Sequence, residues 1–138
     1  MGLYLCILDA DDEEIDGLEL GSYADYGSLI KQVVHKLEGG TAGMRFPVFV
    51  LHSDCDGSWT REDCAALETE LCSIIEEFKK LEAVPFNSDW QFKIARQVGH
   101  CPRNLHQSFI DVDGELLLDR LLELARKAQR ENAPIVFQ

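Results

Sequence analysis

Three groups of residues in this sequence have types and spacings that could do chemistry. The first is an acidic cluster near the N-terminus, made of Asp9, Asp11, Asp12, Glu13, Glu14 and Asp16. Carboxylates this close together repel one another unless water or a basic partner neutralises them. The cluster therefore predicts a binding surface for a positively charged protein. Tyr23 and Tyr26, just beyond it, are further candidate contacts.

The second group is the segment 52–63, which can be laid on the twelve-residue calcium loop of an EF-hand. Asp54 and Asp56 then take the third and fifth positions, and Gly57 takes the sixth. The first position holds a histidine, a poor ligand for Ca²⁺, and the twelfth holds an aspartate instead of the bidentate glutamate. A polar turn before a capped helix explains the same residues. Calcium binding stays an alternative, and Asp54 and Asp56 are also candidate contacts for a basic partner.

The third group consists of thiols and imidazoles. The five cysteines contain no CxxC pair, and none lies in a recognisable nucleophile turn. Cys101 and His106 could in principle meet as a thiol and its base, although both are also explained as ordinary loop residues. No zinc spacing is present, and the glycine-rich stretch 39–43 lacks the lysine of a phosphate-binding loop. We therefore expect no catalytic residue, metal or cofactor, with a thiol-dependent enzyme as the alternative.

Composition narrows the class of partner. The formal net charge of the 138 residues is −12, and residues 1–69 hold 14 acids against 4 bases. Such a surface repels a phosphate backbone, so nucleic acid is not expected as a partner. No apolar stretch approaches the roughly 20 residues that cross a bilayer. Free thiols and the lack of an export signal favour the reducing cytoplasm, with most cysteines as small apolar core groups.

The pattern of apolar residues predicts the elements that position these groups. Alternating or continuous apolar runs predict strands at residues 3–8, 15–20, 46–51, 108–112 and 134–138. Apolar residues at spacings of three and four predict helices at 23–37, 61–81, 88–98 and 115–132. Helices separate most of the strands. The sequence thus predicts a single α/β domain over residues 1–138, with a mixed, partly parallel sheet of about four to five strands and about four helices packed on it.

Five segments also resemble, in their order and spacing, the immunity protein 70 family of bacterial polymorphic toxin systems. They are MGLYLCI (1–7), GSYADY (21–26), the segment 46–59 with its HSDCDG motif, SFIDVDG (108–114) and PIVFQ (134–138). The resemblance implies a cytoplasmic protein that binds and neutralises a cognate toxin. It transfers no binding or catalytic residues to this chain.

The charge of the chain suggests how such a protein could act. Many toxin domains attack nucleic acid and carry basic clefts, and an acidic surface can occupy such a cleft. We therefore predict that the chain occludes the basic active-site cleft of a toxin, with a nuclease as the toxin class that fits. An acidic composition that only maintains solubility is the competing explanation. The sequence does not indicate an oligomeric state.

Overall fold

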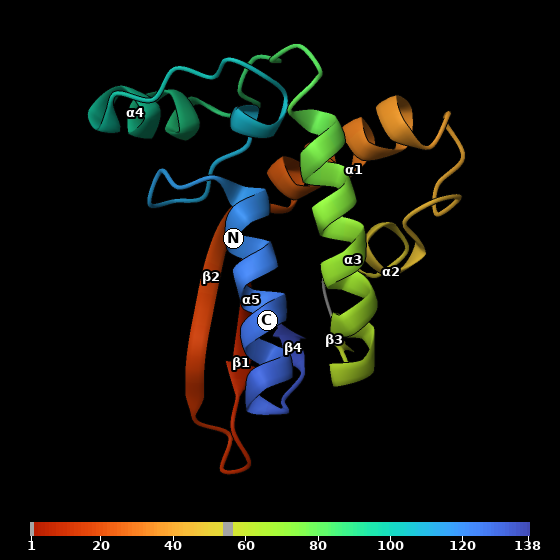
Figure 1. Ribbon diagram of the computed structural model, residues 1–138. Helices are drawn as coiled ribbons and strands as arrows, with labels where there is room; N and C mark the ends of the chain where they lie inside the picture. Colours follow the sequence, from red (N-terminus) through yellow and green to blue (C-terminus); the bar gives the residue numbers. More distant parts are fainter. Residues whose placement is uncertain (1, 54–56) are drawn as a thin grey trace.

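Four strands form one sheet in the order β2-β1-β4-β3 in the computed structural model, which describes residues 2–53 and 57–138 (Figure 1). The strands are β1 (Gly2–Leu8), β2 (Glu14–Ser22), β3 (Ser58–Trp59) and β4 (Ile135–Phe137). The helices are α1 (Tyr23–Leu37), α2 (Pro47–Val50), α3 (Arg61–Phe78), α4 (Asp89–Val98) and α5 (Leu117–Glu131), with a 3₁₀ turn, η1, at His106–Ser108. The prediction of a single-domain α/β fold with helices packed on a small sheet is confirmed.

The expectation of parallel neighbours in the sheet is wrong for the described strands. β1 and β2 are joined by a short turn, and a hairpin of this kind is necessarily antiparallel. β4 enters the sheet between β1 and β3 and runs antiparallel to both. The last strand of the chain therefore occupies an interior position, which the order of elements along the sequence does not reveal.

One face of the sheet packs against the helices. Leu3, Leu5 and Ile7 alternate along β1 and are buried in the core shared with α1, α3 and α5. Tyr4 lies on the opposite face, where its ring covers Gly17 of β2. A Cβ at position 17 would overlap the Tyr4 hydroxyl, so any larger residue there would require the Tyr4 ring to move. An antiparallel sheet with one packed face explains the alternation of β1.

Helices α1 and α3 begin where local sequence signals predict. Ser22 caps α1 and Thr60 caps α3, and each forms a capping box with an aspartate three residues later, Asp25 and Asp63. The inner faces of both helices carry the apolar stripes read from the sequence. Trp59, next to the start of α3, is fully buried against Phe49 and Phe137.

Asp25 also attaches α4 to the rest of the fold. Its side chain is 3% exposed and accepts hydrogen bonds from Asn87 Nδ2 at 2.8 Å, Ser88 Oγ at 2.5 Å and Trp90 Nε1 at 2.9 Å. The backbone N–H and the hydroxyl of Ser22 donate to the same carboxylate. Burial alone would raise the pKa of Asp25, but the hydrogen bonds from Ser88, Asn87 and Ser22 outweigh it and lower the pKa to about 2.

Residues 46–51 contain the short helix α2 with its two caps, so the strand predicted there is wrong. Pro47 takes the first helical position, where its fixed φ suits a helix. The carboxylate of Glu70, on α3, accepts hydrogen bonds from the backbone N–H groups of Val48 at 3.2 Å and Phe49 at 2.9 Å. Those N–H groups have no partner within such a short helix, and a carboxylate from a distant part of the chain satisfies them.

The strand predicted at 108–112 is also wrong. This segment contains the end of η1 and a single bridge between Ile110 and Leu116. Oδ1 of Asp111 accepts hydrogen bonds from the backbone N–H groups of Asp113 and Glu115, which closes a tight turn. Because this turn uses residues 111–115, α5 begins two residues later than predicted, at Leu117.

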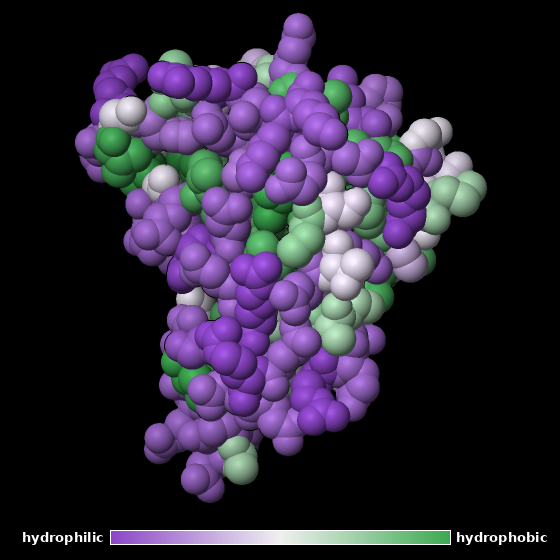
Figure 2. Space-filling model, in the orientation of Figure 1, coloured by the Kyte–Doolittle hydropathy of each residue, from purple (hydrophilic) through white to green (hydrophobic). Residues whose placement is uncertain are grey.

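The face of the molecule in Figure 2 is mostly hydrophilic, including its lower end, where the turn between β1 and β2 lies. None of the helices in the described part of the chain is both long and apolar enough to span a membrane.

Candidate partner-binding surface

The acidic cluster of the sequence lies on and beside the β1–β2 turn, which projects from the lower end of the sheet (Figure 1). Asp9 shapes this turn. Its Oδ1 accepts hydrogen bonds from the backbone N–H groups of Asp11 at 2.8 Å and Glu13 at 3.0 Å. Asp12 adopts a left-handed conformation with a φ of 61°, which aspartate tolerates better than most residues.

Two of the six carboxylates have partners elsewhere in the fold. Glu14 accepts a hydrogen bond of 2.6 Å from the hydroxyl of Tyr4, and this bond, together with burial, raises the pKa of Tyr4 to about 12. Asp16 lies 3.5 Å from the ammonium group of Lys127 on α5. The fold therefore reserves Glu14 and Asp16 largely for internal contacts.

The side chains of Asp11, Asp12 and Glu13 remain. They are exposed, and within residues 2–53 and 57–138 their carboxylates take part in no hydrogen bond or ion pair. We call these three residues the acidic tip. Their mutual repulsion is reduced only by solvent, so a cationic surface brought against the tip gains attraction that nothing inside the protein already satisfies.

The other candidate contacts predicted from the sequence are two tyrosines of α1 and two aspartates of the segment 52–63. Tyr26 is 2% exposed and packs edge-to-face on Phe49, so its prediction as a partner contact is wrong: it lies on the inner face of α1. Tyr23 is partly buried against the core, and its role as a contact stays a prediction. Asp54 and Asp56 lie outside the described residues.

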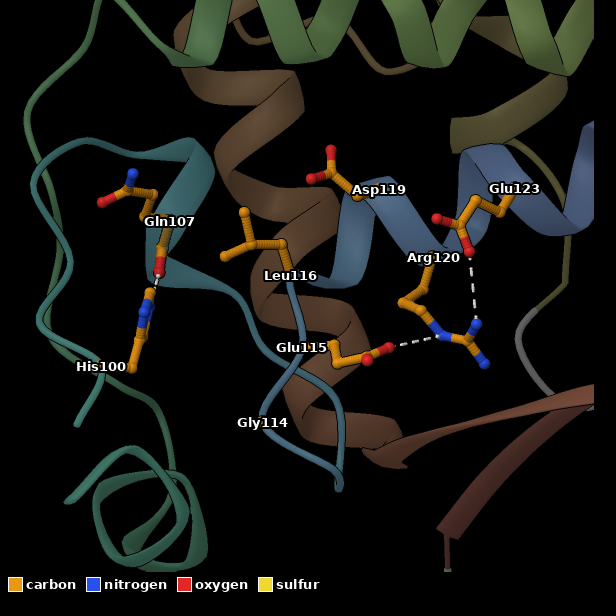
Figure 3. Close-up of a pocket in the computed structure, with 8 residues that line it drawn as sticks. All are labelled: His100, Gln107, Gly114, Glu115, Leu116, Asp119, Arg120 and Glu123. Atoms are coloured by element: carbon orange, nitrogen blue, oxygen red, sulfur yellow. Dashed lines mark hydrogen bonds and ion pairs between the residues drawn. The ribbon is translucent and has the colours of Figure 1, made fainter. Parts of the chain in front are cut away.

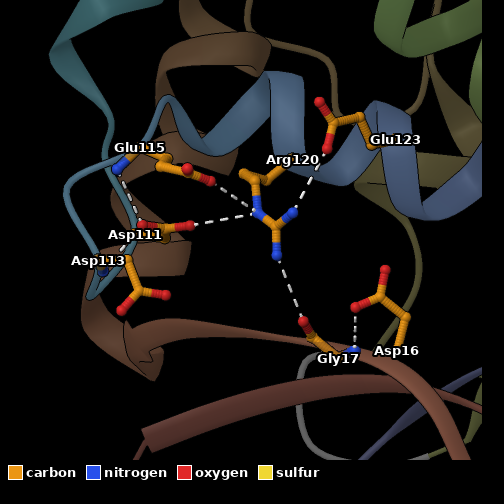
Figure 4. A network of polar contacts seen from close by, with 7 residues as sticks. All are labelled: Asp16, Gly17, Asp111, Asp113, Glu115, Arg120 and Glu123. Atoms are coloured by element: carbon orange, nitrogen blue, oxygen red, sulfur yellow. Dashed lines mark hydrogen bonds and ion pairs between the residues drawn. The ribbon is translucent and has the colours of Figure 1, made fainter.

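A second acidic surface surrounds Arg120 at the start of α5 (Figure 4). The guanidinium lies 3.3 Å from carboxylate oxygens of Glu115 and Glu123 and 3.6 Å from that of Asp111. Another of its nitrogens approaches the carbonyl oxygen of Gly17 on β2 at 3.5 Å. Arg120 therefore ties α5, the turn at 111–115 and β2 together.

Asp111 is the buried member of this network, at 1% exposed. Burial raises its pKa, and the hydrogen bonds from the backbone N–H groups of Glu115 and Asp113 act in the opposite direction. The carboxylate holds the turn at 111–115 in place and faces a single cation. Its role is to stabilise the fold beside this second surface.

Next to Arg120 is an open groove of about 400 Å³ (Figure 3). It is lined by His100, Gln107, Gly114, Glu115, Leu116, Asp119, Arg120 and Glu123. His100 Nε2 is bonded to the carbonyl oxygen of Gln107 at 2.7 Å, which fixes one wall. Sequence reasoning did not identify this groove. The spacing of four between Asp119 and Glu123 was the available signal, since it places these two acids on one side of α5, next to Glu115 in the preceding turn.

The calcium hypothesis gains no support from the described residues. Among them, no group of three or more His, Cys, Asp or Glu side chains is placed to hold a metal ion. The ring nitrogens of His52 contact the carbonyl oxygens of Ser53 and Ser58. Asp63 caps α3 by accepting a hydrogen bond from the backbone N–H of Thr60 at 3.0 Å. Two of the expected ligands, Asp54 and Asp56, lie outside the described residues.

The thiol hypothesis also lacks its geometry. His106 is buried and bonds through Nε2 to Asp119 Oδ1 at 2.9 Å, and in the described part of the chain no contact joins it to Cys101. Cys6 and Cys64 are buried, as expected of core thiols. Burial raises the pKa of Cys64 to about 11, which disfavours the reactive thiolate.

Comparison with known proteins identifies the family. A family model described as immunity protein 70 (Imm70) matches residues 3–137. The chain belongs to the immunity protein 70 family. Neither the comparison with curated proteins nor that with solved structures produced a match. Membership in the Imm70 family implies an immunity protein that acts against a toxin.

Proposed function

We propose that this Imm70 protein binds a cognate polymorphic toxin domain in the bacterial cytoplasm and neutralises it by covering a basic active-site cleft. The acidic tip, Asp11, Asp12 and Glu13, would make the first contact. The proposal needs no catalytic residue, metal or cofactor. It treats residues 1–138 as one immunity-type domain and the toxin, a nuclease in the simplest case, as its partner.

The observation that carries the proposal is the lack of internal compensation at the acidic tip. A fold that pairs Glu14 with Tyr4 and Asp16 with Lys127 leaves the three exposed carboxylates of the tip to solvent. Charges placed this way accelerate association with an oppositely charged partner, and they add little to the stability of the free protein. Projection also matters, because a narrow hairpin can enter a cleft that a flat surface cannot.

The test uses the cognate toxin domain, produced together with the immunity protein in a bacterial host. The tip is neutralised in a triple variant, Asp11→Asn, Asp12→Asn and Glu13→Gln. These changes keep the shape of each side chain and leave the backbone N–H groups of the turn unchanged. We expect the variant to associate with the toxin about tenfold more slowly at low salt, with a weaker dependence of the rate on salt.

A matched control carries the same loss of charge on and just beyond α3, through Glu62→Gln, Glu76→Gln and Glu82→Gln. All three side chains are exposed. The control variant should protect the host and bind the toxin as the unmodified protein does. The occlusion proposal fails if the tip variant associates at the unmodified rate. The neutralising role itself fails if the unmodified protein gives no protection.

A further inference from the structure

A second feature of the lower end of the molecule is a groove of about 400 Å³ between the β1–β2 turn and the C-terminal end of α5. Its floor is apolar and consists of Leu8, Ile15, Ala133 and Pro134. Asp9 and Glu131, both exposed, stand at its rim. None of the described residues that line it is basic. The groove lies beside the acidic tip but is a separate site with its own chemistry.

A β-bulge creates one wall of this groove. Ile7 pairs with Asp16 and Leu8 pairs with Glu14, so Ile15 is an extra residue of β2 with no partner on β1. Bulges redirect side chains and are frequent near functional sites. Here the bulge contributes a half-buried isoleucine to the floor of the groove, although the residues on either side of it in sequence are acidic.

The end of α5 forms the opposite wall. Asn132 takes a left-handed conformation with a φ of 56°, and its N–H bonds to the carbonyl oxygens of Ala128 and Gln129. This cap turns the chain toward β4 and presents Ala133 and Pro134 to the groove. A helix carries partial negative charge at its C-terminus. The helix end and the Glu131 carboxylate thus favour a cation and disfavour an anion at the same rim.

The chemistry of the groove fits one kind of side chain. Arginine and lysine combine an apolar stem with a cationic head, and they bury the stem while the head stays at a polar rim. We infer that this groove receives an arginine or lysine side chain from the basic cleft of the toxin. The stem would lie on Ile15 and Ala133, and the head would reach Asp9 and Glu131. The inference rests on the proposed function and names the partner group for this part of the contact surface.

The test first uses a probe that does not depend on the toxin. The tripeptide acetyl-Gly-Arg-Gly-amide is titrated into the full chain, and backbone amide shifts are followed by NMR. Its neutral isostere, with citrulline in place of arginine, keeps the stem and removes the charge. We expect saturable shifts at residues 8–10, 15 and 131–133 with the arginine peptide, with a dissociation constant on the order of millimolar. The citrulline peptide should produce no saturable shift.

Two variants separate the groove from general acidity. Glu131→Gln removes one charge at the rim and should weaken binding of the arginine peptide about three- to fivefold. Glu82→Gln removes the same charge at an exposed position just beyond α3 that does not line the groove, and it should leave binding unchanged. Ile15→Ala shortens the floor and should weaken binding without changing the net charge.

The results of these titrations can contradict the groove and the proposed function separately. Shifts that stay linear with peptide concentration, that occur equally with citrulline, or that respond equally to Glu82→Gln and Glu131→Gln would overturn the groove as a binding site. Such a result leaves the proposed function intact if the unmodified chain still protects cells from the toxin. If the groove binds the arginine peptide but the chain gives no protection, the proposed function fails, and the assignment of the bound side chain to a toxin fails with it.

Discussion

The buried carboxylate of Asp25 should contribute a large, measurable part of the stability of this fold. In Asp25→Asn, an amide group replaces one of the two oxygens that accept hydrogen bonds. The N–H of Trp90 and the N–H of Ser22 both donate to Oδ2, so an NH₂ group there would face two donors. If the amide turns around, it faces Asn87 and Ser88 instead. Either orientation leaves buried donors without an acceptor.

The magnitude follows from the pKa of Asp25. A fall from 3.8 to about 2 corresponds to roughly 2.5 kcal/mol of preferential stabilisation of the ionised form in the folded state. Because the folded-state pKa is lower than the unfolded one, this stability is fully present above about pH 4 and is lost as the pH falls toward 2. We expect Asp25→Asn to lose about 2 to 3 kcal/mol at pH 7 and to lack this part of the acid dependence.

Urea denaturation from pH 7 down to pH 2, followed by circular dichroism, measures both quantities. Trp90 is half-buried while Trp59 is fully buried, so quenching of fluorescence by acrylamide also reports whether α4 has detached. Asp63→Asn is the matched control, because Asp63 takes the same capping-box position at the more exposed start of α3. It should cost less than about 1 kcal/mol. Equal losses for the two variants, with the same acid dependence, would refute this account of Asp25.

Three further predictions concern packing, ion pairing and thiol reactivity. Gly17→Ala should destabilise the protein by about 1 to 3 kcal/mol, because the new methyl group overlaps the ring of Tyr4. A thermal melt measures the loss, and an unchanged melting temperature would contradict the close contact between Tyr4 and position 17. Arg120→Leu should lower the free energy of unfolding by about 3 kcal/mol in urea denaturation, because it leaves the buried carboxylate of Asp111 without its cation. A loss below about 1 kcal/mol would show that the ion pairs of Arg120 do not stabilise the fold. In the native protein at pH 8, iodoacetamide should modify the exposed Cys101 much faster than the buried Cys64, whose pKa is about 11. Peptide mass spectrometry measures both rates, and faster modification of Cys64 would contradict its burial.

Local signals in the sequence predicted the parts of the fold that depend on neighbouring residues. The apolar stripes of α1 and α3, the helix caps at Ser22 and Thr60 and the strand at β1 are all properties of short segments, and all are confirmed. The two strands that were wrong failed for different reasons: at 108–112 a local turn closed by Asp111 replaces the strand, whereas at 46–51 a distant residue decides the structure. Residues 46–51 have high strand propensity, but Glu70, some twenty residues away, caps their N–H groups and stabilises a helix.

The candidate site was predictable in part. A run of acids between two strands indicated an exposed acidic turn, and the structure places it there. The sequence could not predict which of those acids are free to contact a partner, because Tyr4 and Lys127, from other parts of the fold, bind Glu14 and Asp16. The burial of Tyr26 was open for a similar reason: Tyr23 and Tyr26 share one face of α1, and the ring of Tyr26 is covered by Phe49 from another part of the chain.

The sequence by itself determined the class of fold, the excess of negative charge and its concentration near the N-terminus, since these depend on composition and on short-range periodicity. Only the tertiary structure decided that β4 enters between β1 and β3, that Arg120 joins α5 to β2, and that the end of α5 meets the bulge at Ile15 to form a groove. Those features join residues about a hundred positions apart. The free energy that selects them comes from burial and pairing across the whole core, and no short segment carries that information.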